Sequence, residues 1–240
     1  SEKLDGLNFS IEMETGTGKT YVYLRTIYEL NRNYGFKKFI IVVPSVAIKE
    51  GTKKNFDITK NDFQVLYNKI PIQSTEYSSK NISYIRQFSN SNKIEVMIIT
   101  LDSFNKDKNI MNTSQDKFYG KRPIELVKKT NPILILDEPQ NMERDIAKES
   151  LANLNPLFTL RYSATHKNPY NLIYRLSPVD AYKQKLVKKI VVSSITEDNN
   201  QNSANIECHA ITAGKKIQAK LKVIKQQNDK IKPALITVKH

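Results

Sequence analysis

A loop rich in glycine and threonine, close to the start of the chain, constrains the fold more than any other feature. The loop is Thr15-Gly16-Thr17-Gly18-Lys19-Thr20; it follows the apolar stretch Leu7–Met13 and precedes a helical pattern over Lys19–Asn33. The backbone N–H groups of such a loop point at a polyphosphate, the lysine adds a positive charge, and the following threonine hydroxyl is a ligand for Mg²⁺. The loop therefore predicts a nucleotide-phosphate site held by Thr15, Gly16, Thr17, Gly18, Lys19 and Thr20, with Thr20 also on the metal.

The loop departs from the general G-x-x-x-x-G-K-[ST] pattern in one place. Met13 stands where that pattern has its first glycine, which leaves T-G-x-G-K-T. This shorter form is typical of helicase-like motors. Another kind of anion-binding turn is the simpler alternative, so the prediction depends on what accompanies the loop.

Two adjacent carboxylates follow a second buried strand further along the chain. The run Ile133–Leu136 is wholly apolar and ends in Asp137-Glu138-Pro139-Gln140. Asp137 at the strand end suits the Mg²⁺ shell, and Glu138 can polarise an attacking water. Paired acids at a strand end are often only a solvated turn, but their order after the phosphate loop favours an ATPase site. The candidate catalytic residues are Lys19, Asp137 and Glu138.

A third element, Leu160–Thr165, ends another predicted strand. Its small hydroxyls, Ser163 and Thr165, can sense a nucleotide and relay its state, although a plain turn is the alternative. The neighbouring His166 is more simply a surface or packing residue than a catalyst, because no catalytic partner lies near it in the sequence.

Charge and cysteine content narrow the class of protein. The 240 residues include 38 Lys+Arg against 24 Asp+Glu, a net charge of +14, which favours a polyanion such as nucleic acid or reflects an AT-rich genome. A single cysteine excludes an internal disulfide, and three scattered histidines exclude an ordinary zinc site. No apolar run approaches the about 20 residues of a membrane-spanning helix, so we expect no membrane partner and a cytoplasmic location.

Apolar runs alternate with helical patterns in the way that predicts an α/β fold, a mostly parallel sheet flanked by helices. Two polar stretches, Gln73–Lys93 and Asn105–Lys121, are expected to be surface excursions, at least one of them mobile. The expected strands are Leu7–Met13, Lys38–Val43, Phe63–Tyr67, Ile94–Thr100, Ile133–Leu136 and Leu157–Tyr162, and the expected helices are Lys19–Asn33, Val46–Lys53 and Ile124–Lys129.

The hydrophobic period changes to two near the C-terminus. Apolar residues alternate on both sides of an Ala213-Gly214-Lys215 turn, which predicts a β-hairpin, and Ala234–Val238 predicts a further strand. We expect a motor-type domain over residues 1–178 and a connecting segment with a short β-hairpin extension over 179–240, with a linker near 196–205. This last segment carries 12 Lys against 5 acids, most simply as a solvated face.

Five strings resemble the restriction subunit of type III restriction-modification enzymes, a superfamily 2 helicase-like ATPase. The resemblance covers nearly the whole chain, and Asp137-Glu138-Pro139-Gln140 with Ser163-Ala164-Thr165-His166 is its most specific part. The strings are METGTGKTYVYLRTIYELN, KFIIVVPSVAIKEG, IITLDSFNKD, LILDEPQNME and LRYSATHKNPYNLIYRLSPVDAYKQKLVKKI.

This resemblance implies a RecA-like P-loop domain, the first of two motor domains that close on ATP and move along double-stranded DNA. By the same analogy Gln140, Ser163 and Thr165 couple the ATP site to domain movement. Pro44, Ser45, Thr100 and Ser103 would contact the DNA backbone, where strand ends and helix N-termini present free N–H groups. Target choice in this family comes from the modification (methyltransferase) subunit.

Some of the family's motifs are absent from these 240 residues. We find no Q-x-x-G-R stretch of a second motor domain and no [DE]-x-K tripeptide of a nuclease domain, and the chain starts shortly before the phosphate loop. We therefore expect a fragment that does not cut DNA and hydrolyses ATP only with its second motor domain. Two alternatives remain. One is another superfamily 2 DNA or RNA helicase or remodelling motor, and the other is a non-catalytic module that holds ATP and binds nucleic acid.

Overall fold

The computed structural model describes residues 7–188, 206–213, 217–227 and 230–239. The chain divides into two compact units, Ser1–Lys189 and Ile190–His240. The linker predicted near 196–205 lies outside the described residues. Each unit is considered by itself.

The first unit is built on a sheet of seven parallel strands in the order β3-β4-β2-β5-β6-β1-β7. Helices cover both faces, which explains why residues 39–43 of β2 and 96–99 of β4 are continuous apolar runs and not alternating ones. The predicted parallel sheet is confirmed. The strands are β1 (Asn8–Met13), β2 (Lys38–Val43), β3 (Ile72–Glu76), β4 (Ile94–Thr100), β5 (Ile133–Asp137), β6 (Thr159–Ser163) and β7 (Leu172–Leu176).

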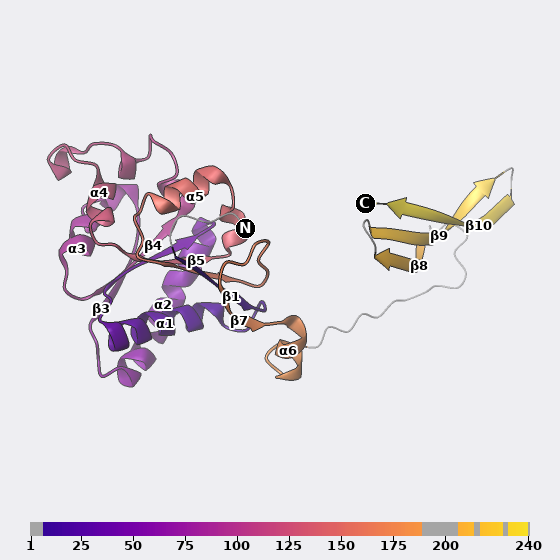
Figure 1. Cartoon of the computed structure of the whole chain (residues 1–240), viewed down its shortest axis with the longest axis horizontal. Helices are drawn as coiled ribbons and strands as arrows, with labels where there is room; N and C mark the ends of the chain where they lie inside the picture. Colours follow the sequence, from indigo (N-terminus) through magenta and orange to yellow (C-terminus); the bar gives the residue numbers. More distant parts are fainter. Residues whose placement is uncertain (1–6, 189–205, 214–216, 228–229, 240) are drawn as a thin grey trace. The chain divides into compact units, whose positions relative to one another are not determined.

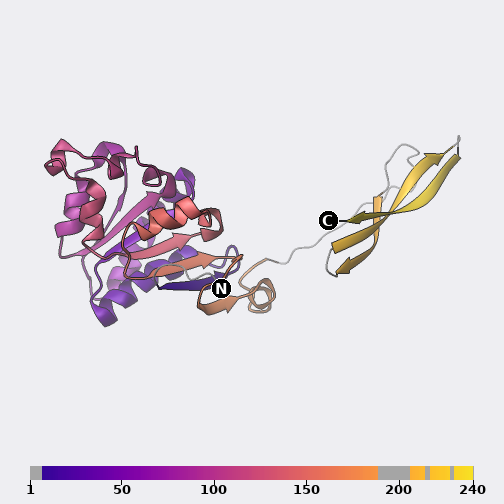
Figure 2. The same ribbon diagram turned by 45° about the horizontal axis from the view of Figure 1, so that its top comes forward.

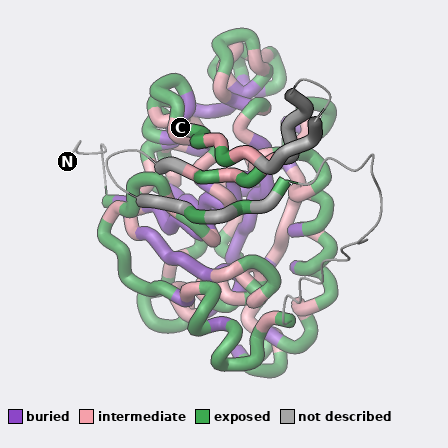
Figure 3. The backbone as a smooth tube through the Cα atoms, turned by 90° about the vertical axis from the view of Figure 1, so that its right-hand side faces the viewer, coloured by how far each residue is buried: buried purple, intermediate pink, exposed green. Residues whose placement is uncertain are grey.

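Figures 1 and 2 show the helices in two layers around the sheet. The helices α1 (Lys19–Tyr34) and α2 (Val46–Leu66) lie on one face, and α3 (Tyr84–Asn90), α4 (Pro123–Lys128) and α5 (Asp145–Ala152) lie on the other. Each face has its own apolar cluster, and alternate residues of β2 belong to one or the other. The short helix α6 (Pro178–Lys183) follows β7. The buried strands form the centre of the unit in Figure 3.

Residues Phe63–Tyr67, predicted as a strand, instead form the end of α2 and its cap, so that prediction is wrong. The run F-Q-V-L-Y fits a period of two over its short length. Phe63 and Tyr67 are nevertheless one helical turn apart, and both rings pack on Tyr28 of α1 at 5.1 and 4.9 Å between centroids. Packing against α1 selects the helix, and Val65 is left exposed.

The two polar stretches are more than surface excursions. Gln73–Lys93 supplies most of edge strand β3 and the helix α3, which buries Tyr84, Ile85 and Phe88. Asn105–Lys121 forms 3₁₀ turns that bury Met111 and Phe118. A few apolar side chains among many polar residues attach each of these stretches to the core. So few apolar residues show neither a helical nor a strand period in the sequence. The elements β7, α5 and α6 were not predicted.

The second unit is a three-stranded antiparallel sheet in the order β10-β9-β8. Its strands are β8 (Ile206–Ala213), β9 (Ile217–Gln227) and β10 (Lys230–Lys239). The predicted hairpin is confirmed, and the further strand pairs with β9. In the part of the chain that the structure describes, no helix has both the length and the apolarity to cross a bilayer.

Candidate nucleotide site

The glycine-rich loop connects β1 to α1 and takes its shape from two glycines. Gly16 and Gly18 have φ angles of +80° and +89°, a left-handed conformation that side chains with a Cβ rarely adopt. The loop is closed by Thr17, whose hydroxyl donates to the Glu14 carbonyl at 2.6 Å. Gly18 is the N-cap of α1 and has no side chain to bond the free N–H groups of the first turn. These N–H groups remain available to an anion.

Lys19 lies across the site and contacts the acidic turn after β5. Its Nζ is 3.0 Å from Glu138 Oε1 and donates to the Met13 carbonyl at 3.4 Å. Only 11% of the Lys19 side chain is exposed. The ammonium group is thus held between the phosphate loop and the acidic turn, where the sequence predicted a phosphate.

Asp137 ends β5 with its carboxylate in a poorly solvated place. Burial and the neighbouring Glu138 raise the pKa of Asp137 to about 6, and Lys19 opposes them. The Tyr23 hydroxyl donates to Asp137 Oδ2 at 3.5 Å and lies 3.3 Å from the Thr52 hydroxyl of α2. A carboxyl group whose charge costs free energy because of burial and a neighbouring carboxylate is suited to a cation.

Glu138 has a left-handed backbone, with φ 54° and ψ 57°, and is the N-cap of a 3₁₀ turn, η5 (Pro139–Met142). A hydrogen bond to its side chain helps to keep Glu138 in this strained conformation: Gln140 Nε2 donates to Glu138 Oε2 at 2.7 Å. Burial alone would raise the pKa of Glu138, but the bonds from Gln140 and Lys19 outweigh it and lower that pKa. Glu138 is therefore an ionised carboxylate in a fixed orientation.

Ser163 at the end of β6 joins the acidic turn to the next loop. The Ser163 hydroxyl is fully buried, lies 3.3 Å from Glu138 Oε2 and 2.7 Å from Gln140 Oε1, and accepts from the Thr165 amide at 3.2 Å. His166 contacts the Ile11 carbonyl at 3.3 Å, and burial lowers its pKa. The structure thus brings Gln140, Ser163 and Thr165 together and gives His166 a packing position.

The loop and the acidic pair line one pocket of about 490 Å³. Five of its residues were not anticipated: Tyr21 and Leu24 on α1, and Ile48, Asn55 and Thr59 on α2. The second helix was predicted only as far as Lys53, so Asn55 and Thr59 were not placed on it. The full lining is Thr15, Gly16, Gly18, Lys19, Thr20, Tyr21, Leu24, Ile48, Asn55, Thr59, Asp137 and Glu138.

A magnesium ion fits the donors on this pocket. Thr20 and Asp137 both line it and offer the hydroxyl and carboxylate oxygens that Mg²⁺ prefers. The raised pKa of Asp137 indicates a carboxylate that lacks a sufficient counter-charge. In the described ranges no cluster of three or more His, Cys, Asp or Glu side chains offers an all-protein metal site. The donors fit a metal that is also held by phosphate oxygens.

The four residues expected at the DNA lie together on the same edge of the sheet but outside the pocket. Strands β2 and β4 are neighbours, with Val43 paired to Thr100, so Pro44–Ser45 and Thr100–Ser103 follow adjacent strand ends. Ser45 caps α2 through the Ile48 amide at 3.3 Å, and Thr100 and Ser103 share a hydrogen bond of 2.7 Å between their hydroxyls. Thr100 is buried, which leaves Ser45 and Ser103 more accessible.

A loop of two left-handed glycines after β1, with an acidic turn after β5 and hydroxyls after β6, lies on a parallel sheet with the RecA-like fold of helicase-like motors. A nuclease-deletion mutant of the type ISP restriction-modification enzyme LlaGI, solved with a DNA substrate mimic, has this fold. The likeness has a TM-score of 0.50 and 15% identity, and it covers 76% of this chain and 19% of that one.

The family model described as type III restriction enzyme, res subunit, matches residues 3–168, and the chain belongs to this family. It is 36% identical over 202 residues to the Res subunit of the type III enzyme EcoP15I of Escherichia coli, covering 75% of this chain and 21% of that protein. Against the EcoPI Res subunit of Escherichia phage P1 it is 33% identical over 201 residues, with the same coverage of 75% and 21%. The chain thus spans about a fifth of the length of these relatives.

Proposed function

We propose that this chain is the ATP-binding half of a DNA-translocating, helicase-like motor in a type III restriction endonuclease. One observation carries the proposal: the phosphate loop, Lys19, Asp137 and Glu138 all line a single pocket. A cytoplasmic location and a role beside a modification subunit belong to the same proposal.

ATP would enter with its phosphates over the N-terminus of α1. The residues Thr15–Thr20 would hold them through backbone N–H groups, and the Lys19 ammonium would move from Glu138 to the phosphates. Mg²⁺, held by Thr20 and Asp137, would supply charge neutralisation at the phosphate oxygens. Glu138 would then keep its bonds to Gln140 and Ser163 and face the position of an attacking water as a general base.

We propose that efficient hydrolysis needs a second motor domain. In the described part of the chain no arginine lines the pocket. An arginine supplied from outside accelerates related phosphoryl transfers by about 10³ to 10⁵. DNA cleavage would require a nuclease domain in the same way, because the 240 residues contain no [DE]-x-K tripeptide.

Double-stranded DNA is the proposed partner of the sheet edge beside the pocket. The adjacent strand ends with Ser45 and Ser103, together with the net charge of +14, suit a phosphate backbone and carry no sequence information. If the binding is electrostatic, the logarithm of the affinity should fall by about 0.9 per phosphate contact for each tenfold rise in salt. A flat salt profile would contradict the proposed DNA interface.

The decisive experiment measures Mg-ATP binding and turnover with and without duplex DNA, for the chain and for Lys19→Ala and Glu138→Gln. We expect ATP binding that Lys19→Ala weakens at least tenfold, as loss of one charge-assisted phosphate contact predicts. Turnover should stay near the level of Glu138→Gln until the second motor domain is added. Equal binding by the chain and Lys19→Ala would refute the ATP site.

Two results would favour the alternatives. A strong preference for single-stranded nucleic acid or RNA would indicate another superfamily 2 helicase or remodelling motor. ATP binding without turnover, even with the second motor domain present, would indicate a module that holds ATP as a structural ligand. DNA-stimulated turnover by the chain alone would show that a complete site assembles without a second motor domain.

A further inference from the structure

A buried ion pair lies beside the nucleotide site and has no role in the function proposed so far. Arg161 is the middle residue of β6, and only 3% of its side chain is exposed. Its guanidinium pairs with Glu143, the residue that follows η5, and its Cζ lies 5.0 Å from the centre of the Tyr170 ring. Burial lowers the pKa of Arg161, and Glu143 opposes this effect.

Burying this ion pair costs free energy of desolvation. Arg161 Nε and Glu143 Oε2 are both buried without a hydrogen bond, although Lys148 Nζ lies 3.9 Å from Glu143 Oε2. Removing two charges from water costs several kcal/mol per ion, and an apolar pair of the same volume is often as stable or more stable. A contribution to stability is therefore a weak explanation of the pair. Its position between η5 and β6 suggests a better explanation.

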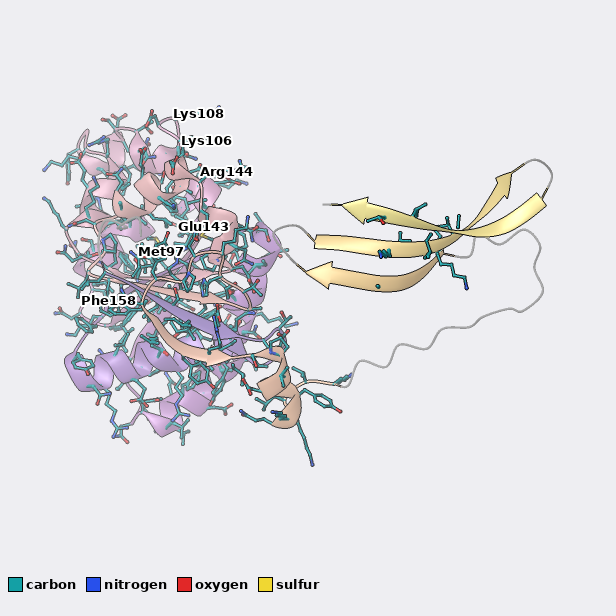
Figure 4. The ribbon with its side chains drawn as sticks, turned by 45° about the vertical axis from the view of Figure 1, so that its right-hand side comes forward. Met97, Lys106, Lys108, Glu143, Arg144 and Phe158 are labelled. Atoms are coloured by element: carbon teal, nitrogen blue, oxygen red, sulfur yellow. The ribbon has the colours of Figure 1, made fainter. Side chains whose placement is uncertain are left out.

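The pair is one of several contacts that fix η5 and its flanking residues to β6, among them the bond from the Glu138 amide to the Tyr162 carbonyl at 3.0 Å. At the first end of the turn, Ser163 bonds Gln140 at 2.7 Å, and at the last end Arg161 holds Glu143. Arg161 and Ser163 are two residues apart on one strand, so both point to the same face of the sheet. In Figure 4 Glu143 is labelled close to the sheet, and its neighbour Arg144 lies further out.

Glu138 stands immediately before this turn, in a left-handed conformation that a glutamate does not prefer. Such a conformation persists only where its surroundings fix it. The bond from Gln140 acts on the Glu138 side chain, and the Arg161–Glu143 pair joins the residue after the turn to β6.

We propose that Arg161 and Glu143 are positioning residues: the ion pair holds η5 so that Glu138 stays aimed at the phosphate pocket. This inference rests on the proposed function, in which Glu138 orients the attacking water. Without the pair, the last residues of η5 would be held mainly by the buried Met142 side chain, and Glu138 would sample other directions while the phosphate loop stays intact.

The test compares Arg161→Met/Glu143→Leu, which replaces the pair by apolar side chains, with Arg122→Met/Glu125→Leu. The control removes an exposed pair of 2.8 Å at the start of α4. Hydrogen exchange of the nucleotide-free chain is measured at the amides of residues 138 and 140–142 and in β2 and β4. We expect the turn amides of the first variant to exchange about fivefold to tenfold faster, with β2 and β4 unchanged.

A second readout is ADP affinity, which depends on the phosphate loop and should equal that of the control variant. Glu143→Gln keeps the size of the side chain, is expected to shift the exchange in the same direction, and serves if the double variant does not fold. Unchanged exchange at residues 138 and 140–142 in a folded variant would overturn the inference. So would faster exchange throughout the sheet, because the pair would then only stabilise the fold. Failure of the parent chain to bind ATP or ADP would refute the proposed function alone, since the exchange experiment needs no nucleotide.

Discussion

Asp137 shows how a binding site can oppose the stability of its own fold. Its carboxylate is buried at the end of β5 beside a second carboxylate, and these two causes raise its pKa to about 6, against Lys19. In the unfolded chain its pKa returns to about 4. The folded state therefore binds the proton more tightly, and stability falls as the pH rises from about 4 to 6 and stays reduced above that range.

We accordingly expect Asp137→Asn to raise the free energy of unfolding by about 3 kcal/mol at pH 8 and by much less at pH 4, because an amide has no charge to bury. Urea unfolding at the two pH values measures the difference. Glu138→Gln is the matched control with the opposite sign, since the pKa of Glu138 is lowered and its charge stabilises the fold. Equal stability of Asp137→Asn and the parent chain at pH 8 would contradict a raised pKa for Asp137.

At the scale of the element, two glycines of neighbouring helices should respond in opposite ways to one substitution. A Cβ would meet no atom within 4 Å at either Gly18 or Gly51, so packing does not separate them. Gly18 has φ +89° at the start of α1, whereas Gly51 lies inside α2. We expect Gly18→Ala to cost about 1–2 kcal/mol and Gly51→Ala to gain up to about 1 kcal/mol, as thermal unfolding would show.

Destabilisation by both substitutions would mean that α2 is not helical around Gly51. A gain from both would mean that the phosphate loop relaxes out of its left-handed conformation at no cost.

The corrected end of α2 gives a second test at this scale. Phe63 is 1% exposed and packs on Tyr21 and Tyr28, whereas Val65 is 78% exposed. We expect Phe63→Ala to cost about 3–5 kcal/mol and Val65→Ala less than about 0.5 kcal/mol, measured by denaturant unfolding. In a strand the residues at 63 and 65 would share one face, and their costs would be similar. Similar costs would therefore restore the strand that the sequence predicted.

The strand–loop–helix units of this fold could be predicted because their signals are local. The strand before Thr15 and the one before Asp137 are apolar runs that end in a polar motif, and the helix from Lys19 has a clear apolar face. The elements β7, α3, α5 and α6 are short, so the few apolar residues of each match several periods.

Prediction of the site from the sequence is limited in the same way at the level of single residues. Motif order predicted Lys19, Glu138 and Ser163, which the structure brings into hydrogen-bonding or ion-pair contact, and Asp137, which lines the same pocket. Nothing in the sequence signals that Arg161 reaches Glu143, because that contact depends on which strand lies next to β5.

At the scale of the whole molecule, the division after Lys189 predicts that the nucleotide site folds without the rest of the chain. Every residue that lines the pocket belongs to the first unit. A chain that ends at Lys189 should bind ATP within about twofold of the 240-residue chain and keep its unfolding midpoint, as calorimetry would show. A lower midpoint or a lost site would mean that the second unit supports the first. Ending the chain after Asn153 is the control, because it removes β6 from the centre of the sheet.

Strand β7 closes the sheet next to β1, and within the described ranges its other edge pairs with no strand. Leu172, Ile173 and Tyr174 on this strand are 39, 61 and 51% exposed. An open edge with apolar side chains is a template on which another extended chain can assemble. We therefore expect the molar mass obtained by light scattering of the purified chain to rise with concentration, and Ile173→Lys to suppress that rise while leaving ATP binding unchanged. Binding constants for this protein will accordingly need to be measured at several dilutions, because self-association would compete with the equilibrium being measured.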